Sequence, residues 1–305
     1  DKLMTNPLYH YIKYGDKITD KKVINEFDKQ TGLISKKRYP RGTVKDILEH
    51  LEKKVSIIIP VYNAYEETCD CIRSVLLNTD ANYELIIIND ASPDERIKPL
   101  LDSLEGIENV RIIHNEENQG FVKNVNKGMV LAADNDVVLL NSDTIVTPRW
   151  LSKMVTAAYS DSTIATATPL SSASDISVPS LGESKDQLFL NKNAYQVSKI
   201  DYDSYLESPT GNGFCLYVKR GAIRKLGMFD TIFEKGYGEE TDFTSRAHKA
   251  GWKNIRVLDV FIYHRRHASF TSEKSNYYKA RNKKIIQQRY PEVYDMWDNF
   301  VKTPH

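Results

Sequence analysis

Four short apolar runs, each followed by polar residues, constrain the fold of this chain more than any other feature. The runs cover residues 55–61, 85–88, 110–113 and 137–140, and segments with helical spacing lie between them. Strands that alternate with helices predict a parallel sheet with crossover connections. Ligands of such sheets bind beyond the carboxyl ends of the strands. The polar residues after the runs therefore predict the polar pocket of an enzyme: Tyr62, Asn63, Asn89, Asp90, Asn118, Gln119, Gly120, Asn141, Ser142 and Asp143.

The length of 305 residues suffices for one large α/β domain or two smaller ones with a sizeable core. With 42 basic and 41 acidic residues the net charge is +1, so no global field attracts nucleic acid, and we expect no nucleic-acid partner. No stretch approaches the roughly 20 apolar residues of a membrane span, and the start does not resemble a signal peptide. Because the chain begins at Asp1 rather than Met, we expect a piece of a larger parent chain with other domains, with a processed product as the alternative.

The three cysteines predict neither a disulfide framework nor a metal site. Cys69 and Cys71 are two residues apart in a helical stretch, where their side chains point to different faces. No further Cys or His follows at a spacing typical of metal sites. We expect Cys69, Cys71 and Cys215 to be reduced and structural, as in a cytosolic protein.

The first fifty or so residues differ in sequence pattern from the rest of the chain. An aromatic, helix-like segment at 9–15, a basic linker at 36–42 and a helical stretch at 44–54 precede the first strand. We predict a helical extension over 1–53. The core is then predicted as strands at 55–61, 84–89, 109–115 and 136–140, with helices at 65–78, 94–104 and 120–133.

The second half of the chain has a less regular pattern. Residues 157–209 are rich in Ser, Ala and Asp, and we predict extended loops around a cleft there. Regular patterning resumes at 213–219, followed by predicted helices at 220–226 and 240–250 and a strand at 255–263. The tail from 272 to 300 is predicted as helices separated by Pro291.

Asp143 is a candidate metal ligand. It follows an apolar strand in the sequence Asn141-Ser142-Asp143-Thr144, where a carboxylate could hold a hard divalent cation. The same residues also suit an ordinary turn or helix cap, which Pro148 supports.

Three carboxylates lie within four residues at the start of a predicted helix: Glu239, Glu240 and Asp242. One of them could act as a general base, because crowded like charges raise carboxylate pKa values toward working pH. Helix N-termini also favour acidic residues without any catalysis, and this alternative is strongest for Glu239.

Two further segments carry candidate binding residues. His264 follows a strand and could ligate a metal such as Mn²⁺, while Arg265 and Arg266 could grip phosphate, although a solvated strand end is the alternative. The loop of Gly211, Asn212 and Gly213 would let the backbone approach a substrate closely. This loop lacks the glycine spacing of a dinucleotide-binding motif, and the chain contains no phosphate-loop lysine pattern. The sequence therefore argues against a kinase, a P-loop ATPase or a dehydrogenase.

The order of six motifs resembles family 2 glycosyltransferases of the GT-A fold, of the bacterial surface-polysaccharide type. The motifs are VSIIIPVYN at 55–63, IINDAS at 87–92, NQGFVKNVN at 118–126, LLNSDT at 139–144, GEETD at 238–242, and His264 with Ser269. The resemblance implies an α/β fold with a mostly parallel, Rossmann-like twisted sheet flanked by helices. It implies a GT-A domain over 54–270, with a nucleotide-binding half at 54–147, an acceptor half at 148–270, and C-terminal helices at 271–305.

The resemblance also implies a set of donor-nucleotide residues, which lie at the ends of the first four predicted strands: Pro60, Tyr62, Asn63, Asp90, Asn118, Gly120, Asn124, Asn141 and Ser142. In that family Pro60, Tyr62 and Asn63 would line the pocket for the base and ribose. Asp90 would bond the base. Asn118, Gly120 and Asn124 would lie by the nucleotide and the donor sugar.

By the same resemblance, Asp143 is the metal carboxylate of an Asp-x-Asp motif and His264 a further ligand of Mn²⁺ or Mg²⁺. Glu240 takes the place of the catalytic base, with Gly211, Asn212 and Gly213 as the loop for acceptor and donor sugar. Two positions depart from the family pattern: Asn141 replaces the first Asp of the motif, and Glu240 stands where Asp is usual. The second departure makes Glu239 a rival base.

The expected function is inverting, metal-dependent transfer from a nucleoside-diphosphate sugar, with a UDP-sugar as the expected donor. The acceptor would be a hydroxyl of a glycan, a lipid-linked glycan or a glycoprotein, in the synthesis of bacterial surface polysaccharide or glycoconjugates. We expect a cytoplasmic protein, with peripheral contact to the inner face of the plasma membrane if the acceptor is lipid-linked.

Two other functions stay open. A sugar-nucleotide nucleotidyltransferase uses a related sheet, but it usually carries a glycine-rich, basic loop after the first strand, and residues 62–67 contain neither Gly nor Lys. A catalytically decayed module that binds glycan or a partner would fit Asn141, whereas the retained Asp143, Glu240 and His264 oppose it.

Overall fold

A ten-stranded sheet organises the described part of the chain. The structure, a computed structural model, describes residues 37–38, 49, 51–172, 184–200, 204–265 and 272–302. These residues belong to one unit, Lys37–Lys302. The helix-like segment at 9–15, most of the linker and of the helical stretch before the first strand, Arg266 and Ser269 lie outside the described residues.

The first half of the sheet alternates strands and helices as the sequence predicts. Its elements are β2 (Val55–Val61), α4 (Tyr65–Asn78), β3 (Tyr83–Asn89), α5 (Ile97–Asp102), β4 (Val110–His114), α6 (Phe121–Leu131) and β5 (Asp136–Leu140). Strands β5, β2, β3 and β4 are neighbours in this order and all parallel, so their carboxyl ends share one edge. The predicted bounds are confirmed to within three residues.

The second half contains more regular structure than predicted. Its elements are β6 (Thr144–Ile145), α7 (Trp150–Tyr159), β7 (Ile164–Ser171), α8 (Gln187–Ile200), β8 (Ser204–Ser208), β9 (Cys215–Val218), α9 (Arg220–Leu226), η2 (Thr231–Phe233), α10 (Glu239–Lys249), β10 (Lys253–His264), α11 (Ser272–Arg289) and α12 (Val293–Lys302). The prediction of extended loops over 157–209 was wrong. Strand β7 is buried on both faces, but its sequence IATATPLS consists mainly of small residues and contains a proline, a composition that is also typical of loops. Helix α8 has a weakly amphipathic sequence, and its start is marked by Asp186, which accepts from the backbone N of Phe189 (2.9 Å).

The sheet as a whole is mixed. Its order is β1-β8-β10-β7-β9-β5-β2-β3-β4, where β1 is Lys37–Arg38, and β6 pairs with β10 off this path. Strand β9 runs antiparallel to both β5 and β7, and β8 runs antiparallel to β10. The α/β class is confirmed, and the parallel arrangement holds for β5-β2-β3-β4 and for the β7–β10 pair.

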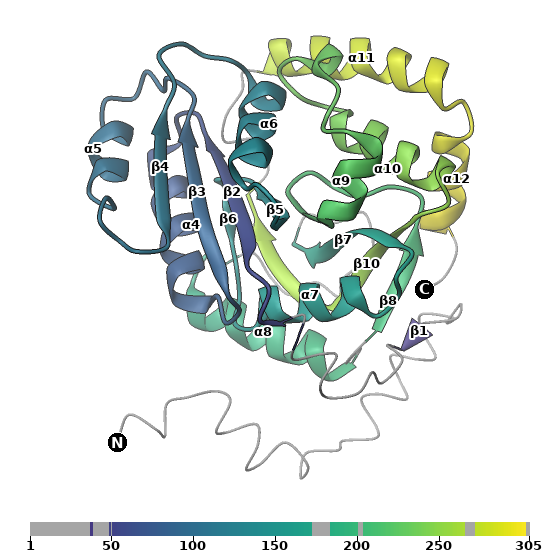
Figure 1. Cartoon of the computed structure of the whole chain (residues 1–305), viewed down its shortest axis with the longest axis horizontal. Coiled ribbons are helices and arrows are strands. Elements are labelled where there is room, and N and C mark those ends of the chain that lie inside the picture. Colours follow the sequence, from purple (N-terminus) through teal and green to yellow (C-terminus); the bar gives the residue numbers. More distant parts are fainter. Residues whose placement is uncertain are drawn as a thin grey trace. The chain divides into compact units, whose positions relative to one another are not determined.

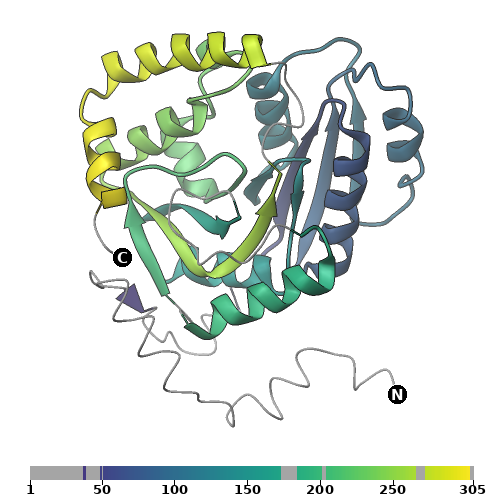
Figure 2. The ribbon, with the colours of Figure 1, turned by 180° about the vertical axis from the view of Figure 1, so that it is seen from behind.

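Helices cover both faces of the sheet. Successive side chains of a strand point to opposite faces, so the apolar residues of β2 need a packing partner on each side. Ile57 and Ile59 of β2 pack in a cluster with residues of α4, α5 and α7, whereas Ile58 packs with residues of α6, α9 and α10. Helices α6 and α10 lie in front of the sheet in Figure 1, and the view from behind in Figure 2 brings α4 and α8 forward. Ile286 of α11 and Val293 of α12 join the second cluster.

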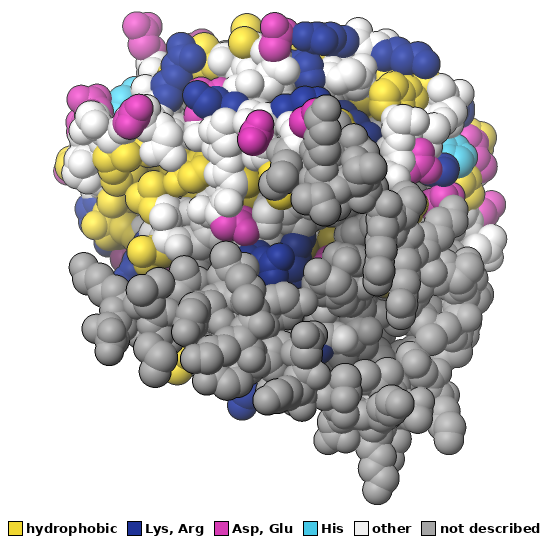
Figure 3. Space-filling view, turned by 60° about the horizontal axis from the view of Figure 1, so that its bottom comes forward, with side chains coloured by type: hydrophobic (Ala, Val, Ile, Leu, Met, Phe, Trp, Pro, Cys, Tyr) yellow, Lys and Arg dark blue, Asp and Glu magenta, His cyan; other side chains and the backbone are white. Residues whose placement is uncertain are grey.

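The surface and the cysteines agree with the composition. Positive and negative side chains are interspersed on the face seen in Figure 3, next to a group of hydrophobic side chains. All three cysteines are free, and burial raises the pKa of the Cys71 thiol to about 12, which leaves it unreactive.

Among the described residues, no helix is both long and apolar enough to cross a bilayer.

Candidate active site

Asp90 holds the loop after β4 in place. Its Oδ1 accepts hydrogen bonds from the backbone N of Gln119 (2.8 Å) and from Nδ2 of Asn115 (2.9 Å), and its Oδ2 accepts from the backbone N of Gly120 (2.9 Å). The residue is only 3% exposed. A carboxylate has about four acceptor positions, so this arrangement leaves Asp90 one for a ligand.

Asn63 connects the loops after β2 and β3. Its φ of 59° lies in the left-handed region, which Asn tolerates better than most residues. Its backbone N donates to Oγ of Ser92 (3.0 Å), and its Oδ1 accepts from the backbone N of Asp94 (3.2 Å). Pro60 and Tyr62 are half-buried beside it, so the carboxyl edge of β2 presents a partly open surface.

Asn118 and Gly120 meet a lysine that the sequence analysis missed. Nδ2 of Asn118 donates to the carbonyl of Asp90 (3.2 Å), and its Oδ1 accepts from Nζ of Lys235. Gly120 has a φ of 83°, and a Cβ there would lie 2.9 Å from Cδ of Lys235, so glycine is required. The available signal was the position of Lys235 directly before Gly236, in the segment Gly236-Tyr237-Gly238.

Asn124 is built into the structure of the loop. It is 1% exposed; its Nδ2 donates to the carbonyl of Ile88 (3.2 Å) and its Oδ1 accepts from Nδ2 of Asn115 (3.1 Å). These contacts leave Asn124 little surface for a nucleotide. Its effect on a ligand would therefore pass through Asn115 and the loop that Asp90 holds.

The structure brings Asp143 and His264 together. Strand β6 pairs antiparallel with the end of β10, with Thr144 opposite His264. As a result, Nε2 of His264 lies 3.4 Å from Oδ1 of Asp143, and both side chains are mostly buried. The ring of Phe214 stacks on the imidazole, with centroids 5.1 Å apart and an interplanar angle of 18°. Phe214, which directly follows the glycine loop, was not singled out from the sequence.

These two residues fit a divalent cation. Ligand atoms at about 2.1–2.4 Å from one ion, in adjacent octahedral positions, lie about 3.0–3.4 Å apart. In the described ranges no third His, Cys, Asp or Glu completes a metal cluster with them. Further ligands would have to come from a substrate and from water.

Asn141 and Ser142 shape the turn that carries Asp143. The backbone N of Asn141 donates to the carbonyl of Phe214 (2.9 Å), and its carbonyl accepts from Oγ1 of Thr144 (2.7 Å). Ser142 is buried. The turn is thus fixed from both sides, which holds the carboxylate of Asp143 toward β10.

Arg265 is already engaged. Its Nη1 pairs with Oε1 of Glu67 on α4, and Nζ of Lys185 lies 3.7 Å from the same carboxylate oxygen. Its backbone N donates to the carbonyl of Asp143 (3.0 Å). Arg265 therefore lies beside the candidate metal ligands, but its charge is balanced by Glu67.

Glu239 and Glu240 both face the glycine loop. A Cβ on Gly213 would lie 3.7 Å from Oε1 of Glu239 and 3.8 Å from Cδ of Glu240. Asn212 holds the loop, since its backbone N donates to Oγ1 of Thr168 (3.2 Å). Two of the candidate bases therefore lie next to the loop that is expected to contact the acceptor.

The two glutamates lie in different environments. Glu239 is 4% exposed, and burial, followed by the charge of Glu240, holds its pKa well above the usual value. Glu240 is half-buried, and its Oε2 accepts from the backbone N of Gly238 (3.3 Å).

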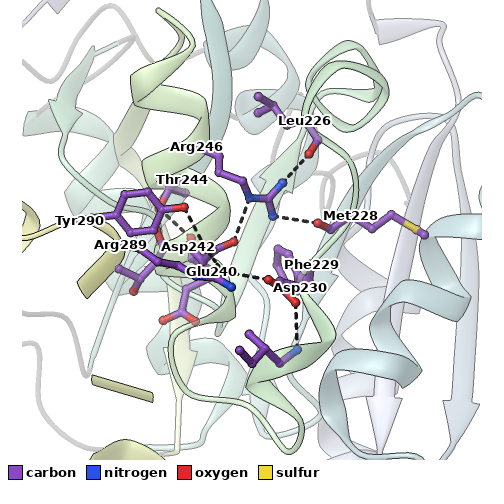
Figure 4. Close-up of polar contacts among 12 residues, drawn as sticks. Leu226, Met228, Phe229, Asp230, Glu240, Asp242, Thr244, Arg246, Arg289 and Tyr290 are labelled. Carbon is purple, nitrogen blue, oxygen red and sulfur yellow. Dashed lines mark hydrogen bonds and ion pairs between the residues drawn. The ribbon is translucent and has the colours of Figure 1, made fainter. Parts of the chain in front are cut away.

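Asp242 has a structural position. It is fully buried; Oδ2 accepts from Nε of Arg246 (2.8 Å), and Oδ1 accepts from Nη1 of Arg289 (2.8 Å) and the hydroxyl of Tyr290 (2.9 Å). Figure 4 shows Asp242 facing this cluster, while the side chain of Glu240 points away from it. Asp242 therefore joins α10 to the end of α11, and its carboxylate is poorly placed to take a proton from a substrate.

Comparison with known proteins identifies the family. Residues 56–227, more than half of the chain, match the family model described as glycosyl transferase family 2. A glycosyltransferase of Haemophilus influenzae is 32% identical over 102 residues, which are 33% of this chain and 32% of that protein. Glycosyltransferase GlyG of Streptococcus pneumoniae is 28% identical over 97 residues, 32% of each chain. The matches thus span about a third of the length of these relatives.

Solved structures show the same fold. The crystal structure of GalNAc-T7 with UDP, GalNAc and Mn²⁺ superposes with a TM-score of 0.56 at 17% identity, covering 70% of this chain and 44% of that one. The mannosyltransferase PcManGT of Pyrobaculum calidifontis, in complex with GDP-Man and Mn²⁺, gives 0.56 at 15% identity, covering 79% and 63%. Both are glycosyltransferases, and the shared fold is GT-A, as the sequence predicts.

Proposed function

We propose that this chain, which belongs to glycosyl transferase family 2, moves a sugar from a nucleoside-diphosphate sugar to a hydroxyl of a glycan acceptor, with inversion at the anomeric carbon. The observation that carries the proposal is the meeting of Asp143 and His264, 3.4 Å apart although 121 positions separate them in the sequence. They meet at the carboxyl edge of the parallel strands, where ligands of such sheets bind.

Donor binding is assigned to the loops at this edge. Tyr62 and Asn63 would flank the base and ribose, Asp90 would offer its remaining acceptor position to the base, and Asn118 would lie by the sugar. Since the two structural neighbours hold UDP and GDP-Man, both nucleotides belong in a binding test, with a UDP-sugar as the first donor to try.

Asp143 and His264 would hold Mn²⁺ or Mg²⁺. When bound, such an ion supplies Lewis-acid stabilisation of the charge that builds on the leaving diphosphate. The mixed oxygen and nitrogen ligands suit Mn²⁺, and both structural neighbours contain this ion.

Glu240 is the proposed base. Its carboxylate takes the proton of the acceptor hydroxyl, the hydroxyl oxygen forms the bond to the anomeric carbon, and the bond from that carbon to the diphosphate breaks. The position against Gly213 puts this carboxylate beside the loop that would meet the acceptor.

The setting of the reaction forms part of the proposal. We propose that 54–270 is the transferase domain, with its nucleotide half at 54–147 and its acceptor half at 148–270. The acceptor would be a glycan, a lipid-linked glycan or a glycoprotein of bacterial surface-polysaccharide synthesis. The proposed location is the cytoplasm, at the inner face of the plasma membrane for a lipid-linked acceptor.

Release of nucleotide from a panel of UDP-, GDP-, dTDP- and CDP-sugars, with Mn²⁺ and oligosaccharide acceptors, tests the proposal. We expect turnover with one nucleotide class, lost on chelation and in Asp143→Asn. If no donor is turned over although the protein binds a glycan, the chain is a decayed binding module.

A further inference from the structure

The carboxyl group of Glu239 lies in an enclosed position between two loops. Its Oε1 lies 3.7 Å from the position of a Cβ on Gly213, and its Oε2 lies 3.8 Å from the position of a Cβ on Gly236. Among the described residues, Oε2 is buried without a hydrogen-bond partner. Because an ionised carboxylate in such a position would be costly, the environment of Glu239 favours its neutral form.

Glu240, the next residue, lies in a more open environment at the start of the same helix. It is in the first turn of α10, a helix of 11 residues, whose N-terminus attracts negative charge. The backbone N of Gly238 donates to its Oε2 (3.3 Å). The two neighbouring carboxyl groups therefore differ in burial and in hydrogen bonding: Oε2 of Glu239 is buried without a partner, whereas Oε2 of Glu240 accepts from a backbone N–H.

The charged groups around Glu239 agree with a neutral carboxyl group at this position. Burial first, and then the charge of Glu240, hold the pKa of Glu239 well above its usual value, and a hydrogen bond with Glu240 adds to the effect. The backbone N–H of Glu239 acts in the opposite direction but is outweighed. On α12, burial and the charge of Glu240 raise the pKa of Tyr294. Gly213 and Gly236, which lie close to the two carboxyl oxygens of Glu239, add no charge.

We propose that Glu239 is a positioning residue that keeps its proton throughout the reaction and donates it as a hydrogen bond to Glu240. This inference rests on the proposed function, in which Glu240 is the base. The acceptor O–H proton moves to Glu240, the acceptor oxygen bonds to the anomeric carbon, and the diphosphate leaves. Glu239 neither gains nor loses a proton, and it fixes the rotamer of Glu240 against Gly213.

Two substitutions separate a neutral donor from an ionised base. Glu239→Gln keeps an N–H donor without charge, so we expect kcat within about tenfold of wild type. Glu239→Met has a similar length but no donor, and we expect kcat to fall about 10–100-fold, the loss typical of a hydrogen bond to a charged group. The acidic limb of the kcat–pH profile should move to higher pH in Glu239→Met alone. Glu105→Gln, at an exposed site, serves as the unchanged control.

A stability measurement tests the same inference without a substrate. The unfolded chain ionises Glu239 at its ordinary pKa, whereas the folded protein retains the proton, so the wild type loses stability as pH rises above that value. Glu239→Gln lacks this loss. Its Tm relative to wild type should therefore rise by at least about 2 °C between pH 5 and pH 8.

The outcomes are distinct. If Glu239→Gln abolishes transfer, or if Glu239→Met leaves it intact, the inference is overturned while the proposed function stands. If the wild type transfers no sugar at all, the proposed function fails, and the Tm comparison still decides whether Glu239 is neutral. A Tm difference that does not change with pH would overturn the inference.

Discussion

His264 and Asp143 lie side by side because two residues of β6 pair with the end of β10. Nε2 of the histidine is 3.4 Å from Oδ1 of the aspartate, and Phe214 stacks on the imidazole. The pair is the one place in the described residues where a predicted carboxylate ligand and a predicted imidazole ligand meet. We therefore treat it as the anchor of the candidate active site.

Removal of either ligand should weaken metal-dependent nucleotide binding. Asp143→Asn and His264→Ala are each expected to raise the Kd for Mn²⁺ by at least about tenfold, since even indirect partners of metal ligands contribute that much. Mn²⁺ titration in the presence of nucleotide provides the measurement. His248→Ala, at an exposed site on α10, should leave the Kd unchanged. Unaltered Mn²⁺ affinity in both variants would place the metal elsewhere.

Removal of the proposed base should affect chemistry and spare binding. Glu240→Gln is expected to lower kcat by about 10²–10⁴-fold, the range for loss of a general base. The Kd for nucleotide should stay within about twofold of wild type, because the substitution keeps size and shape. Steady-state kinetics and calorimetry on the same preparation provide the measurement. Normal turnover in Glu240→Gln would assign the base to another group.

Asp242 should prove structural. Its buried carboxylate accepts hydrogen bonds from Arg246, Arg289 and the Tyr290 hydroxyl, so Asp242→Asn leaves two part-buried guanidinium groups and a buried hydroxyl without their charged partner. We expect the free energy of unfolding to fall on the order of 3 kcal/mol, as measured by urea denaturation. The folded fraction should keep its kcat. Full stability together with lost transfer would instead make Asp242 a catalytic residue.

In the glycine loop, alanine substitutions at Gly211 and at Gly213 should have different effects. At Gly211 a Cβ would lie 2.6 Å from Cδ1 of Leu216, so Gly211→Ala should lower Tm by several degrees. At Gly213 the nearest atoms belong to the side chains of Glu239 and Glu240 at 3.7–3.8 Å, which is ordinary contact. Gly213→Ala should therefore keep the Tm but raise KM for the acceptor. Equal Tm values for the two variants would contradict this account of the loop.

The sequence predicts the parallel half of the fold well, for a physical reason. Strand β2 and helices α4 and α9 have the predicted bounds, because apolar runs and helical spacing are local properties of the chain. The direction of β9 depends on where the chain returns to the sheet, which local pattern does not encode. Strand β7 was missed because its small Ala, Thr and Ser residues and its Pro169 are also typical of loops, and its burial on both faces depends on tertiary packing.

In the candidate site, too, the residues of local motifs were predicted from the sequence, whereas contacts between distant segments were not. The resemblance to a family names Asp143, His264 and Glu240, and the structure adds how they are held. The burial of Asp242 depends on α11 packing against α10, and the contact of Lys235 with Asn118 depends on a loop 117 positions away. Such long-range contacts follow from tertiary packing and leave no periodic signal in the sequence.

Calorimetric titration with UDP, GDP, dTDP and CDP, each with Mn²⁺ and with EDTA, tests the central claim most directly. The account predicts that one nucleotide binds with Mn²⁺, and that binding is lost with EDTA and in Asp143→Asn. Binding that persists in EDTA would contradict the metal site formed by Asp143 and His264. If none of the four nucleotides binds under any condition, the claim that this edge of the sheet is a nucleotide-sugar site is wrong.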